Sequence, residues 1–595
     1  MAAELIVSYL EQIGVQAVFG VPGGAIEPIY DALARSARRG GPRAIVARHE
    51  AGAAFMADGY ARETGRLGVC IATSGPGTTN LITGVACAYE NDIPILVITA
   101  QPAIHSFGKG ALQESSCTGI DAIGMFRHCT RYNSLVSHAD QMETKLTNAL
   151  MQATHGRGGP VHLSIPVDIL RGLAKITGTG TGTGLGLVTV PPALLQSRAE
   201  LVDMANVRSL HAELAQARNP VFLIGAGSGE AIEAILELAQ RTNALFITTP
   251  DAKGFINPRH RAFRGVFGFG GHASADALLR SEPDLVIAFG TGFSELSSGN
   301  WSSSLLNQRL VHVDCLEEHL MRSTMARLHV RGSILAVCTQ LLALFGDDAP
   351  LRCADLPDAP AHLCHPDVEL HAPAQFNSEA TPIKPQRLMK ELSRRCPPNT
   401  RFLADTGNSM LWTVHYLQPN DRRGARSGAL AATAAGRPRR SGTASWLRVL
   451  MDFAPMGWAI GAAVGVARAN PACPVVCITG DGSYLMNGQE ITVAAAEGLT
   501  VVFIVLNDSA LGMVMHGQRL SKAEPIGFEL PKVDYRRMAE AMGIPGHVIE
   551  SPADLVALDF DAILAHKGPT MLDIRVDREE VPPMMQRVKT LAAVK

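Results

Sequence analysis

The sequence predicts an α/β fold of three domains, each a mainly parallel sheet flanked by helices. Short apolar runs alternate with helix-like patterns along the chain, at residues 68–75, 93–100, 160–166, 220–227, 284–290, 474–480 and 500–508. Strands buried on both faces form continuous β-branched runs, and the helices between them favour parallel pairing. The length of 595 residues also exceeds what one hydrophobic core usually holds.

Two segments of unusual composition separate the expected domains. Residues 171–195 are rich in Gly and Thr and then in Pro, and residues 346–383 combine many prolines with Asp, Ala and His, as linkers do. A third irregular stretch, 421–446, is expected to be a mobile surface insert, with a basic interaction patch as the alternative. A C-terminal tail follows at 576–595. The domains are therefore expected at 1–170, 196–345 and 384–575.

Composition and charge exclude several classes of function. The formal net charge of -2 gives no electrostatic reason to expect nucleic acid or an anionic membrane surface as a partner. Apolar runs stay well below membrane-spanning length, and the first 20 residues lack the pattern of a secretion signal. The 11 cysteines are scattered without metal-binding spacing, which is typical of thiols in a reducing compartment. We therefore expect a cytoplasmic protein.

One carboxylate, Asp481, stands between Gly480 and Gly482, where the apolar run 474–480 ends. Ligands of parallel sheets bind at such strand ends, and glycines let the backbone approach a phosphate. A carboxylate would repel phosphate unless a divalent cation such as Mg²⁺ lay between them. A second oxygen ligand is expected from Asn507 and Asp508, because one strand–helix–strand interval would make the two strand ends neighbours.

This pair of strand ends resembles the signature of thiamine diphosphate enzymes, a GDG motif followed one strand later by Asn-Asn. The resemblance implies that Asp481, Asp508 and the main chain of Ala510 bind Mg²⁺, while Gly482 and Ser483 face the diphosphate. Asp508 departs from the usual Asn, which keeps an oxygen ligand and adds a negative charge. A plain strand-end turn is the alternative for the GDG motif alone.

Three N-terminal segments resemble the acetolactate synthase group of these enzymes: FGVPGGAIEPIYDAL (19–33), RHEAGAAFMADGYAR (48–62) and SGPGTTN (74–80). The segment DFAPMGWAIGAAVG (452–465) resembles the part of that family that supports the cofactor. The resemblance implies that the first domain binds the pyrimidine ring, that the middle domain is Rossmann-like, and that the third binds the diphosphate. It also implies a homodimer or homotetramer with active sites at the subunit interface.

The same resemblance assigns roles to individual residues. Glu50 would hydrogen-bond the aminopyrimidine ring and drive it to its imino tautomer, which removes the C2 proton of the thiazolium. Met456 would bend the cofactor, and Gln113 would act near the thiazole. A helix-cap Glu and a core Met are the alternatives for the first two. Further cofactor contacts are implied for Val21, Thr73, Asn80, Asn408, Ser409 and Met513.

The family joins pyruvate to a second 2-oxo acid, and four departures concern the acceptor. Gly292 replaces an Arg, Gly517 a Trp, Val167 a Lys, and Leu112 a Phe. A pocket that loses two bulky groups and two cations should be wider and less suited to a small carboxylate. We therefore expect carboligation to a larger or uncharged carbonyl acceptor, with His516 beside that pocket.

Several alternatives remain open from the sequence. On the same cofactor, the reaction could be simple 2-oxo acid decarboxylation or hydrolysis of a cyclic 1,2-diketone. The glycine-rich turn in 221–231 is the basis for a nicotinamide-dependent dehydrogenase, and an inactive regulatory homologue is a further alternative. Residues 253–275 resemble a domain that carries FAD in the family, but Gly292 leaves FAD open. His105 is interpreted as a loop histidine, against a proton-relay role.

Overall fold

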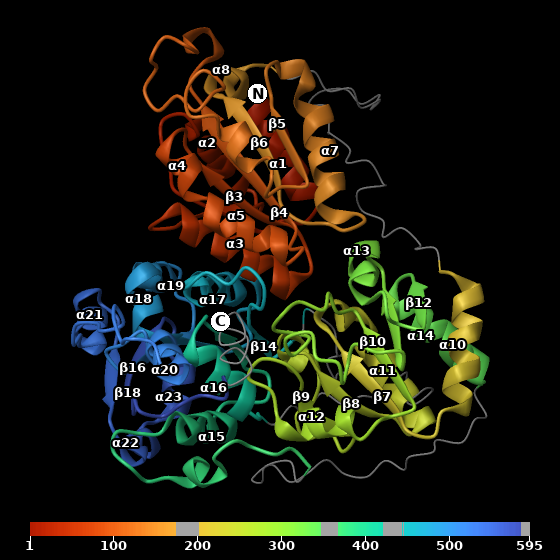
Figure 1. Ribbon diagram of the computed structural model, residues 1–595. Coiled ribbons are helices and arrows are strands. Elements are labelled where there is room, and N and C mark those ends of the chain that lie inside the picture. Colours follow the sequence, from red (N-terminus) through yellow and green to blue (C-terminus); the bar gives the residue numbers. More distant parts are fainter. Residues whose placement is uncertain (174–201, 347–366, 420–442, 444, 585–595) are drawn as a thin grey trace. The chain divides into compact units, whose positions relative to one another are not determined.

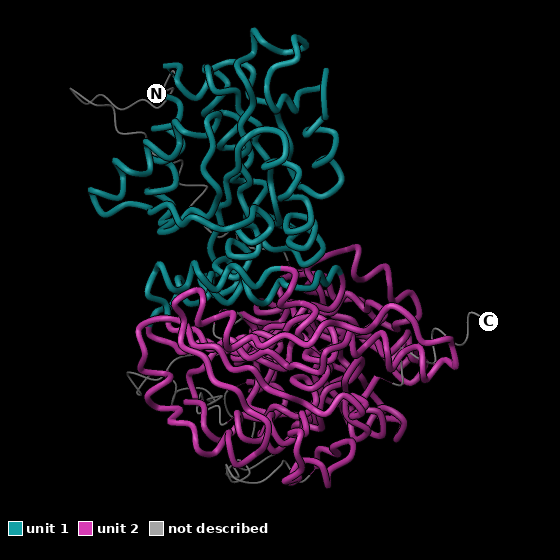
Figure 2. Tube along the Cα trace, turned by 90° about the vertical axis from the view of Figure 1, so that its left-hand side faces the viewer, with its two compact units in different colours: residues 1–199, 453–471, 487–499 teal, residues 200–452, 472–486, 500–595 magenta. Residues whose placement is uncertain are grey.

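The computed structural model describes residues 1–173, 202–346, 367–419, 443 and 445–584. The predicted linkers 171–195 and 346–383, the insert 421–446 and the tail 576–595 therefore lie partly or mainly outside the described residues. The chain forms two compact units, coloured separately in Figure 2. Unit 1 comprises residues 1–199, 453–471 and 487–499, and unit 2 comprises residues 200–452, 472–486 and 500–595.

Unit 1 contains a six-stranded parallel sheet in the order β2-β1-β3-β4-β6-β5 (Figure 1). Its strands are β1 (Ala17–Gly20), β2 (Arg43–Val46), β3 (Gly68–Ala72), β4 (Ile95–Gln101), β5 (Tyr132–Leu135) and β6 (Val161–Pro166). Its helices are α1 (Ala2–Gln12), α2 (Glu27–Ala37), α3 (Glu50–Thr64), α4 (Pro76–Asn80), α5 (Ile82–Glu90), α6 (Ala122–Phe126), α7 (Met142–Thr154), α8 (Val167–Arg171), α17 (Trp458–Ala469) and α19 (Ile491–Ala496).

Helices α3 and α17 of unit 1 pack so closely that their backbones touch. A Cβ at Gly59 would lie 2.1 Å from the carbonyl oxygen of Ala462, and one at Gly465 would lie 2.0 Å from that of Met56. Glycine is therefore required at both crossing points. The indole N–H of Trp458 also donates to Asp58 Oδ1 at 3.0 Å. The close approach explains why both helices are rich in Gly and Ala.

Unit 2 contains two more six-stranded parallel sheets, in the orders β12-β11-β10-β7-β8-β9 and β14-β13-β15-β16-β18-β17. The middle sheet has β7 (Pro220–Ile224), β8 (Leu245–Thr248), β9 (Phe263–Val266), β10 (Leu285–Phe289), β11 (Leu310–Asp314) and β12 (Leu328–Arg331). The third sheet has β13 (Arg401–Ala404), β14 (Leu447–Arg448), β15 (Val475–Gly480), β16 (Val501–Asn507), β17 (Gly546–Ile549) and β18 (Thr570–Arg575).

The helices of unit 2 alternate with these strands. They are α10 (Met204–Gln216), α11 (Ile232–Thr242), α12 (Ala273–Arg280), α13 (Glu317–Leu320), α14 (Ile334–Phe345), α15 (Pro385–Arg395), α16 (Asn408–Tyr416), α18 (Asp481–Asn487), α20 (Gly512–Ser521), α21 (Tyr535–Ala541), α22 (Pro552–Ala557) and α23 (Phe560–Ala565).

The fold class predicted from the sequence is confirmed. Each of the seven apolar runs coincides with a strand to within a few residues, namely β3, β4, β6, β7, β10, β15 and β16. Buried Cys70 and Cys477 are free thiols within these strands. Among the described helices, none combines the length and apolar character that a bilayer span requires. The domain boundaries stay a prediction.

Candidate active site

The carboxyl edge of the first sheet carries two of the predicted cofactor contacts. Val21 directly follows β1 and Thr73 directly follows β3, and these strands are neighbours through the pair Gly20 and Ile71. A Cβ at Gly23 would lie 2.6 Å from Thr73 Cβ, so the loop after β1 lies directly against Thr73. The structure therefore brings Val21 and Thr73 to the same edge.

Glu50 is the first residue of α3 and is buried. Its Oε2 accepts a hydrogen bond of 2.9 Å from Nδ2 of Asn80, the last residue of α4. Between them, a Cβ at Gly77 would lie 3.3 Å from Glu50 Oε1 and 3.0 Å from Thr73 Cγ2. Three residues predicted from the N-terminal motifs therefore converge around α4.

Gln113 lies against the same turn but has a strained backbone. Its φ of 57° is in the left-handed region, and a Cβ at Gly75 would lie 2.8 Å from Gln113 Cβ. The neighbouring Ser115 is fixed by Gln101, whose side-chain amide donates to its carbonyl at 2.8 Å and accepts its N–H at 3.1 Å. Leu112 is 86% exposed. The Gln101–Ser115 contact thus fixes the loop that presents Gln113.

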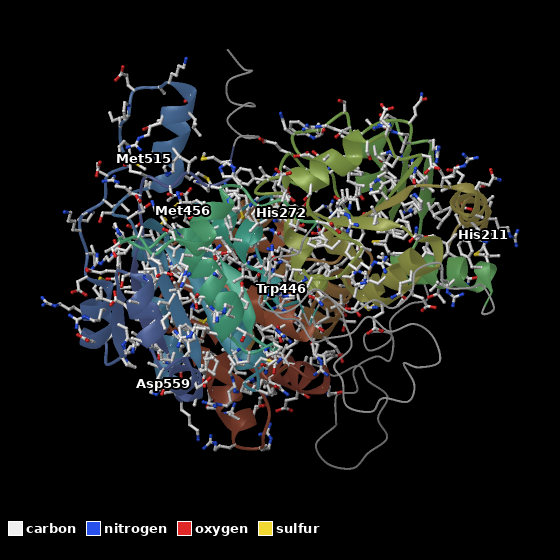
Figure 3. All side chains as sticks on the ribbon, turned by 90° about the horizontal axis from the view of Figure 1, so that it is seen from below. His211, His272, Trp446, Met456, Met515 and Asp559 are labelled. Carbon is white, nitrogen blue, oxygen red and sulfur yellow. The ribbon has the colours of Figure 1, made fainter. Side chains whose placement is uncertain are left out.

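Met456 and His105 are two further residues of unit 1 for which the sequence suggests a role. Met456, labelled in Figure 3, is half-buried, and Gly457 after it has a φ of 88° and caps the N-terminus of α17. His105 is exposed on the turn Ile104–Ser106, as expected for a loop histidine.

Asp481 and Asp508 lie at the carboxyl ends of neighbouring strands in unit 2. Asp481 follows β15 and Asp508 follows β16, and the two strands pair through Gly480 and Leu506. Burial raises the pKa of both carboxyl groups, and the charge of Asp481 raises the pKa of Asp508 further. The structure therefore places the two acids at neighbouring strand ends, as their spacing in the sequence predicts.

The start of α16 joins the same edge, because β13 pairs with β15. A Cβ at Gly512 would lie 2.5 Å from Asn408 Nδ2 and 2.9 Å from Asp508 Oδ2, so these two side chains are neighbours. Ser409 is buried, and its hydroxyl donates to the carbonyl of Asp405 at 2.7 Å. The Asn408 side chain therefore lies beside Asp508, whereas the Ser409 hydroxyl bonds to the loop between β13 and α16.

The turns around these acids bend the backbone toward them. The N–H of Gly482 donates to Asp481 Oδ1 at 2.8 Å, and that of Ala510 donates to Asp508 Oδ1 at 3.1 Å. Ser509 between the last two has a φ of 55°. Ser483 Oγ lies 3.5 Å from the carbonyl oxygen of Thr406, next to the start of α16. Met513 on α20 packs against the core of unit 2.

Unsatisfied oxygens at this edge fit a divalent cation. Asp481 Oδ2 and Asn408 Oδ1 are buried and lack a hydrogen-bond partner among the described residues. Such atoms are costly unless a ligand satisfies them. Within the described ranges, no group of three or more His, Cys, Asp or Glu side chains is arranged for a metal. A cation here would rely on two carboxylates plus oxygens of the main chain and of a bound ligand, as Mg²⁺ commonly does.

The residues of unit 2 that are predicted to line the acceptor pocket belong to two different sheet domains. His516 and Gly517 are on α20, and His516 Nε2 is buried without a hydrogen-bond partner in the described part of the chain. Gly292 follows β10 of the middle sheet instead. A Cβ there would lie 3.2 Å from Arg322 Nη1, which donates to the Gly292 carbonyl at 2.9 Å. Sequence reasoning missed this guanidinium, because no motif connects Arg322 to position 292.

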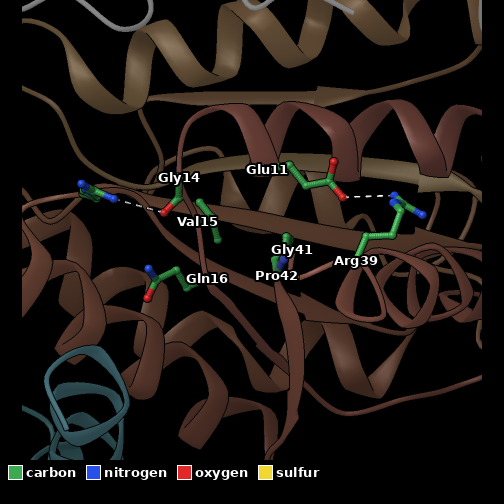
Figure 4. Close-up of a pocket in the computed structure, with 9 residues that line it drawn as sticks. Glu11, Gly14, Val15, Gln16, Arg39, Gly41 and Pro42 are labelled. Carbon is green, nitrogen blue, oxygen red and sulfur yellow. Dashed lines mark hydrogen bonds and ion pairs between the residues drawn. The ribbon is translucent and has the colours of Figure 1, made fainter. Parts of the chain in front are cut away.

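A cavity of about 450 Å³ opens at the edge of the first sheet where β1 and β2 begin (Figure 4). It is lined by Gly14, Gln16 and Gly41 among others, which precede β1 and β2. Two of its charged groups are paired, because Arg39 contacts Glu11 Oε1 at 3.2 Å, and Arg66 donates to the carbonyl of Gly14 at 3.3 Å. The predicted cofactor residues lie at the opposite, carboxyl edge of these strands.

Comparison with known proteins agrees with this arrangement. Residues 1–123 match the N-terminal TPP binding domain of thiamine pyrophosphate enzymes, residues 207–341 their central domain, and residues 405–574 their C-terminal TPP binding domain. Thiamine pyrophosphate is another name for thiamine diphosphate. The glycine-rich turn in 221–231 falls within the central-domain match, which accounts for it without a nicotinamide.

Full-length relatives are also similar. The chain is 31% identical to acetolactate synthase isozyme 1 large subunit of Escherichia coli, covering 98% of this chain and 95% of that one. It is 31% identical to an acetolactate synthase of Mycobacterium bovis, with 98% and 89% covered. A probable acetolactate synthase large subunit of Methanocaldococcus jannaschii is likewise 31% identical, with 98% and 93% covered. The chain therefore belongs to the acetolactate synthase family of thiamine diphosphate-dependent enzymes.

Proposed function

We propose that the protein decarboxylates a 2-oxo acid, pyruvate in the first instance, and joins the acyl group to a second carbonyl compound. The observation that carries this proposal is the pair of neighbouring acids Asp481 and Asp508 with an unsatisfied carboxylate oxygen at a strand edge. Relatives named acetolactate synthase support an acetolactate-type or acyloin product.

In this proposal each half of the site has a separate task. Asp481, Asp508 and the main-chain oxygen of Ala510 hold Mg²⁺, which neutralises the diphosphate, and Asn408 contributes a further polar group. When bound, thiamine diphosphate supplies the nucleophilic carbon and the electron sink that decarboxylation needs. Glu50 holds a proton at the aminopyrimidine nitrogen, and the side-chain amide of Asn80, which donates to Glu50 Oε2, fixes the orientation of this carboxylate.

The acceptor is proposed to be larger or less charged than a small 2-oxo acid. Gly517 removes the indole that the family uses to limit the pocket, and the open space at this position supports the proposal. The positive charge missing at Gly292 is present nearby in Arg322. The altered acceptor preference therefore rests on Gly517 and Leu112 more than on Gly292.

Assembly and further cofactors are also proposals. The active form is a homodimer or homotetramer, in which Glu50 of one subunit faces the metal site of another. Light scattering of the purified protein tests the oligomer. FAD is a candidate second cofactor of the middle domain, and the visible absorbance of the purified protein tests it.

A single incubation tests the proposed reaction. The protein, thiamine diphosphate, Mg²⁺ and pyruvate are combined with a panel of aldehydes, ketones and 2-oxo acids, and the products are identified by mass. The Asp481→Asn variant serves as control. Coupled products are expected. Aldehyde alone would indicate a simple decarboxylase, and cleavage of an added cyclic 1,2-diketone without carbon dioxide would indicate a hydrolase; either outcome contradicts carboligation.

A further inference from the structure

A second buried carboxylate holds the backbone that leads into Glu50. Glu490 is fully buried in unit 1. The N–H of Arg48 donates to both of its oxygens, at 3.2 and 3.1 Å, and the N–H of His49 donates to Oε1 at 2.8 Å. Glu490 lies nine residues after Asp481 in the sequence, yet the predicted site gives it no role.

These contacts fix the point at which α3 begins. A helix start leaves N–H groups without partners inside the helix, and side chains must satisfy them. His49 Nδ1 accepts the N–H of Ala51 at 3.1 Å, while Glu490 satisfies the two N–H groups just before the helix. A negative charge is also favoured near a helix N-terminus. The backbone of residues 48–51 is therefore fixed from both directions.

Gly52 of α3 lies directly against the Glu490 carboxylate. A Cβ at Gly52 would lie 2.4 Å from Glu490 Oε1 and 2.5 Å from its Cδ, so a side chain there would force the Glu490 side chain to shift. The Arg48 side chain donates to Thr492 Oγ1 at 2.8 Å, which ties the same two segments together a second time. Any side chain at position 52 would displace the acid from its two N–H partners.

Burying a carboxylate is costly unless its hydrogen bonds are specific. A neutral amide offers only one oxygen, so it accepts fewer of the three contacts that Glu490 makes. Glu50 is thus held on its backbone side by Glu490 and on its carboxylate side by Asn80.

We propose that Glu490 is a positioning residue for Glu50. By fixing residues 48 and 49, it sets the direction in which the Glu50 carboxylate projects from the start of α3. The inference rests on the proposed function, because it assumes that Glu50 promotes loss of the C2 proton from bound thiamine diphosphate. Glu490 itself exchanges no proton with the cofactor in this role.

The test measures exchange of the C2 proton of bound thiamine diphosphate for deuterium, by acid quench and proton NMR. It uses the full-length protein saturated with thiamine diphosphate and Mg²⁺. The test variants are Glu490→Gln and Gly52→Ala. Glu497→Gln is the matched control, because it makes the same change in the same segment but removes only the 3.3 Å ion pair with Arg43. Glu50→Gln is the reference for loss of the acid.

Glu490→Gln and Gly52→Ala are expected to slow the exchange about tenfold or more, as small misplacements of a reacting group do. The Kd for thiamine diphosphate, measured by calorimetry, should change far less, because the metal and diphosphate contacts are untouched. A merely structural role would instead weaken cofactor binding and lower the melting temperature without a specific slowing at saturation. Glu497→Gln should exchange like the wild type.

If folded Glu490→Gln exchanges the C2 proton at the wild-type rate while Glu50→Gln exchanges it slowly, the inference is overturned and the proposed function still stands. Wild-type exchange in Glu50→Gln itself contradicts the proposed role of Glu50 instead. If Glu490→Gln does not fold, Gly52→Ala alone tests the inference, because this variant keeps Glu490 and displaces its carboxylate.

Discussion

The methyl group of Met584 borders the space into which a side chain at Gly517 would project. A Cβ at position 517 would lie 4.0 Å from Met584 Cε, and outside its own helix it would meet no other atom of the described residues within that distance. Met584 is buried and belongs to the segment that follows the last strand of the third sheet. Position 517 is therefore open except toward this C-terminal segment.

Gly517→Trp should narrow the range of acceptors. An indole at this position would fill open space and press on Met584, so kcat/KM for bulky acceptors is expected to fall about tenfold relative to small ones. Competition between a small and a large acceptor, with products quantified by mass, measures the change. Adding Met584→Ala should restore part of the range. Unchanged selectivity in Gly517→Trp would contradict the pocket argument.

Asp481→Asn should weaken Mg²⁺-dependent binding of thiamine diphosphate about tenfold or more, because one charged oxygen ligand is lost. Asp508→Asn should bind within a few-fold of the wild type, because the thiamine diphosphate signature carries Asn at this position, whereas Asp481 is the acid of its GDG motif. Calorimetry with Mg²⁺ and with a chelator measures both. Wild-type binding by Asp481→Asn would place the metal elsewhere.

Glu490 should make stability depend on pH. Burial raises its pKa from 4.5 to about 7; the nearby Glu50 charge acts in the same direction, and the backbone N–H groups and charge of Arg48 oppose it. The folded state then binds this proton more tightly than the unfolded state, so stability is lost as pH rises from about 4.5 to about 7. The loss for one such group is roughly 3 kcal/mol.

Urea denaturation midpoints at pH 5 and pH 8 check this dependence. Glu490→Gln should show a smaller fall in midpoint across that range than the wild type, and Glu497→Gln should follow the wild type. Equal pH dependence in wild type and Glu490→Gln would mean that Glu490 does not titrate in this range.

Gly465→Ala should destabilise the protein by about 1–3 kcal/mol, because its Cβ would lie 2.0 Å from the Met56 carbonyl and would push α3 and α17 apart. A lower melting temperature by scanning calorimetry is expected. A melting temperature equal to that of the wild type would show that the helices separate without cost.

Strands and strand-end acids were predictable, because both leave a local pattern. Continuous apolar runs marked seven of the interior strands but not β1, β8, β11, β13 and β18. The interval between Asp481 and Asp508 indicated adjacent strand ends. Edge strands escaped this reasoning. β2 is largely exposed and β14 has only two residues, so neither forms a buried run.

Contacts made by distant segments could not be predicted. Three contacts join parts of the chain that no periodicity or spacing relates: Arg322 with Gly292, Met584 with Gly517, and Glu490 with the N–H of His49. Sequence motifs predicted which residues contact the cofactor. They did not indicate which neighbours fix those residues or fill the space that a substitution leaves.

The helix pair α3 and α17 sets a limit on how the gene can be divided. A fragment ending near residue 170 would keep Glu50 but lose α17. The face of α3 that carries Gly59 packs against the backbone of α17. Such a fragment would expose that face to water and leave the indole partner of Asp58 behind. Swapping modules between members of this family would therefore require transplanting the two late helical segments along with the first 170 residues.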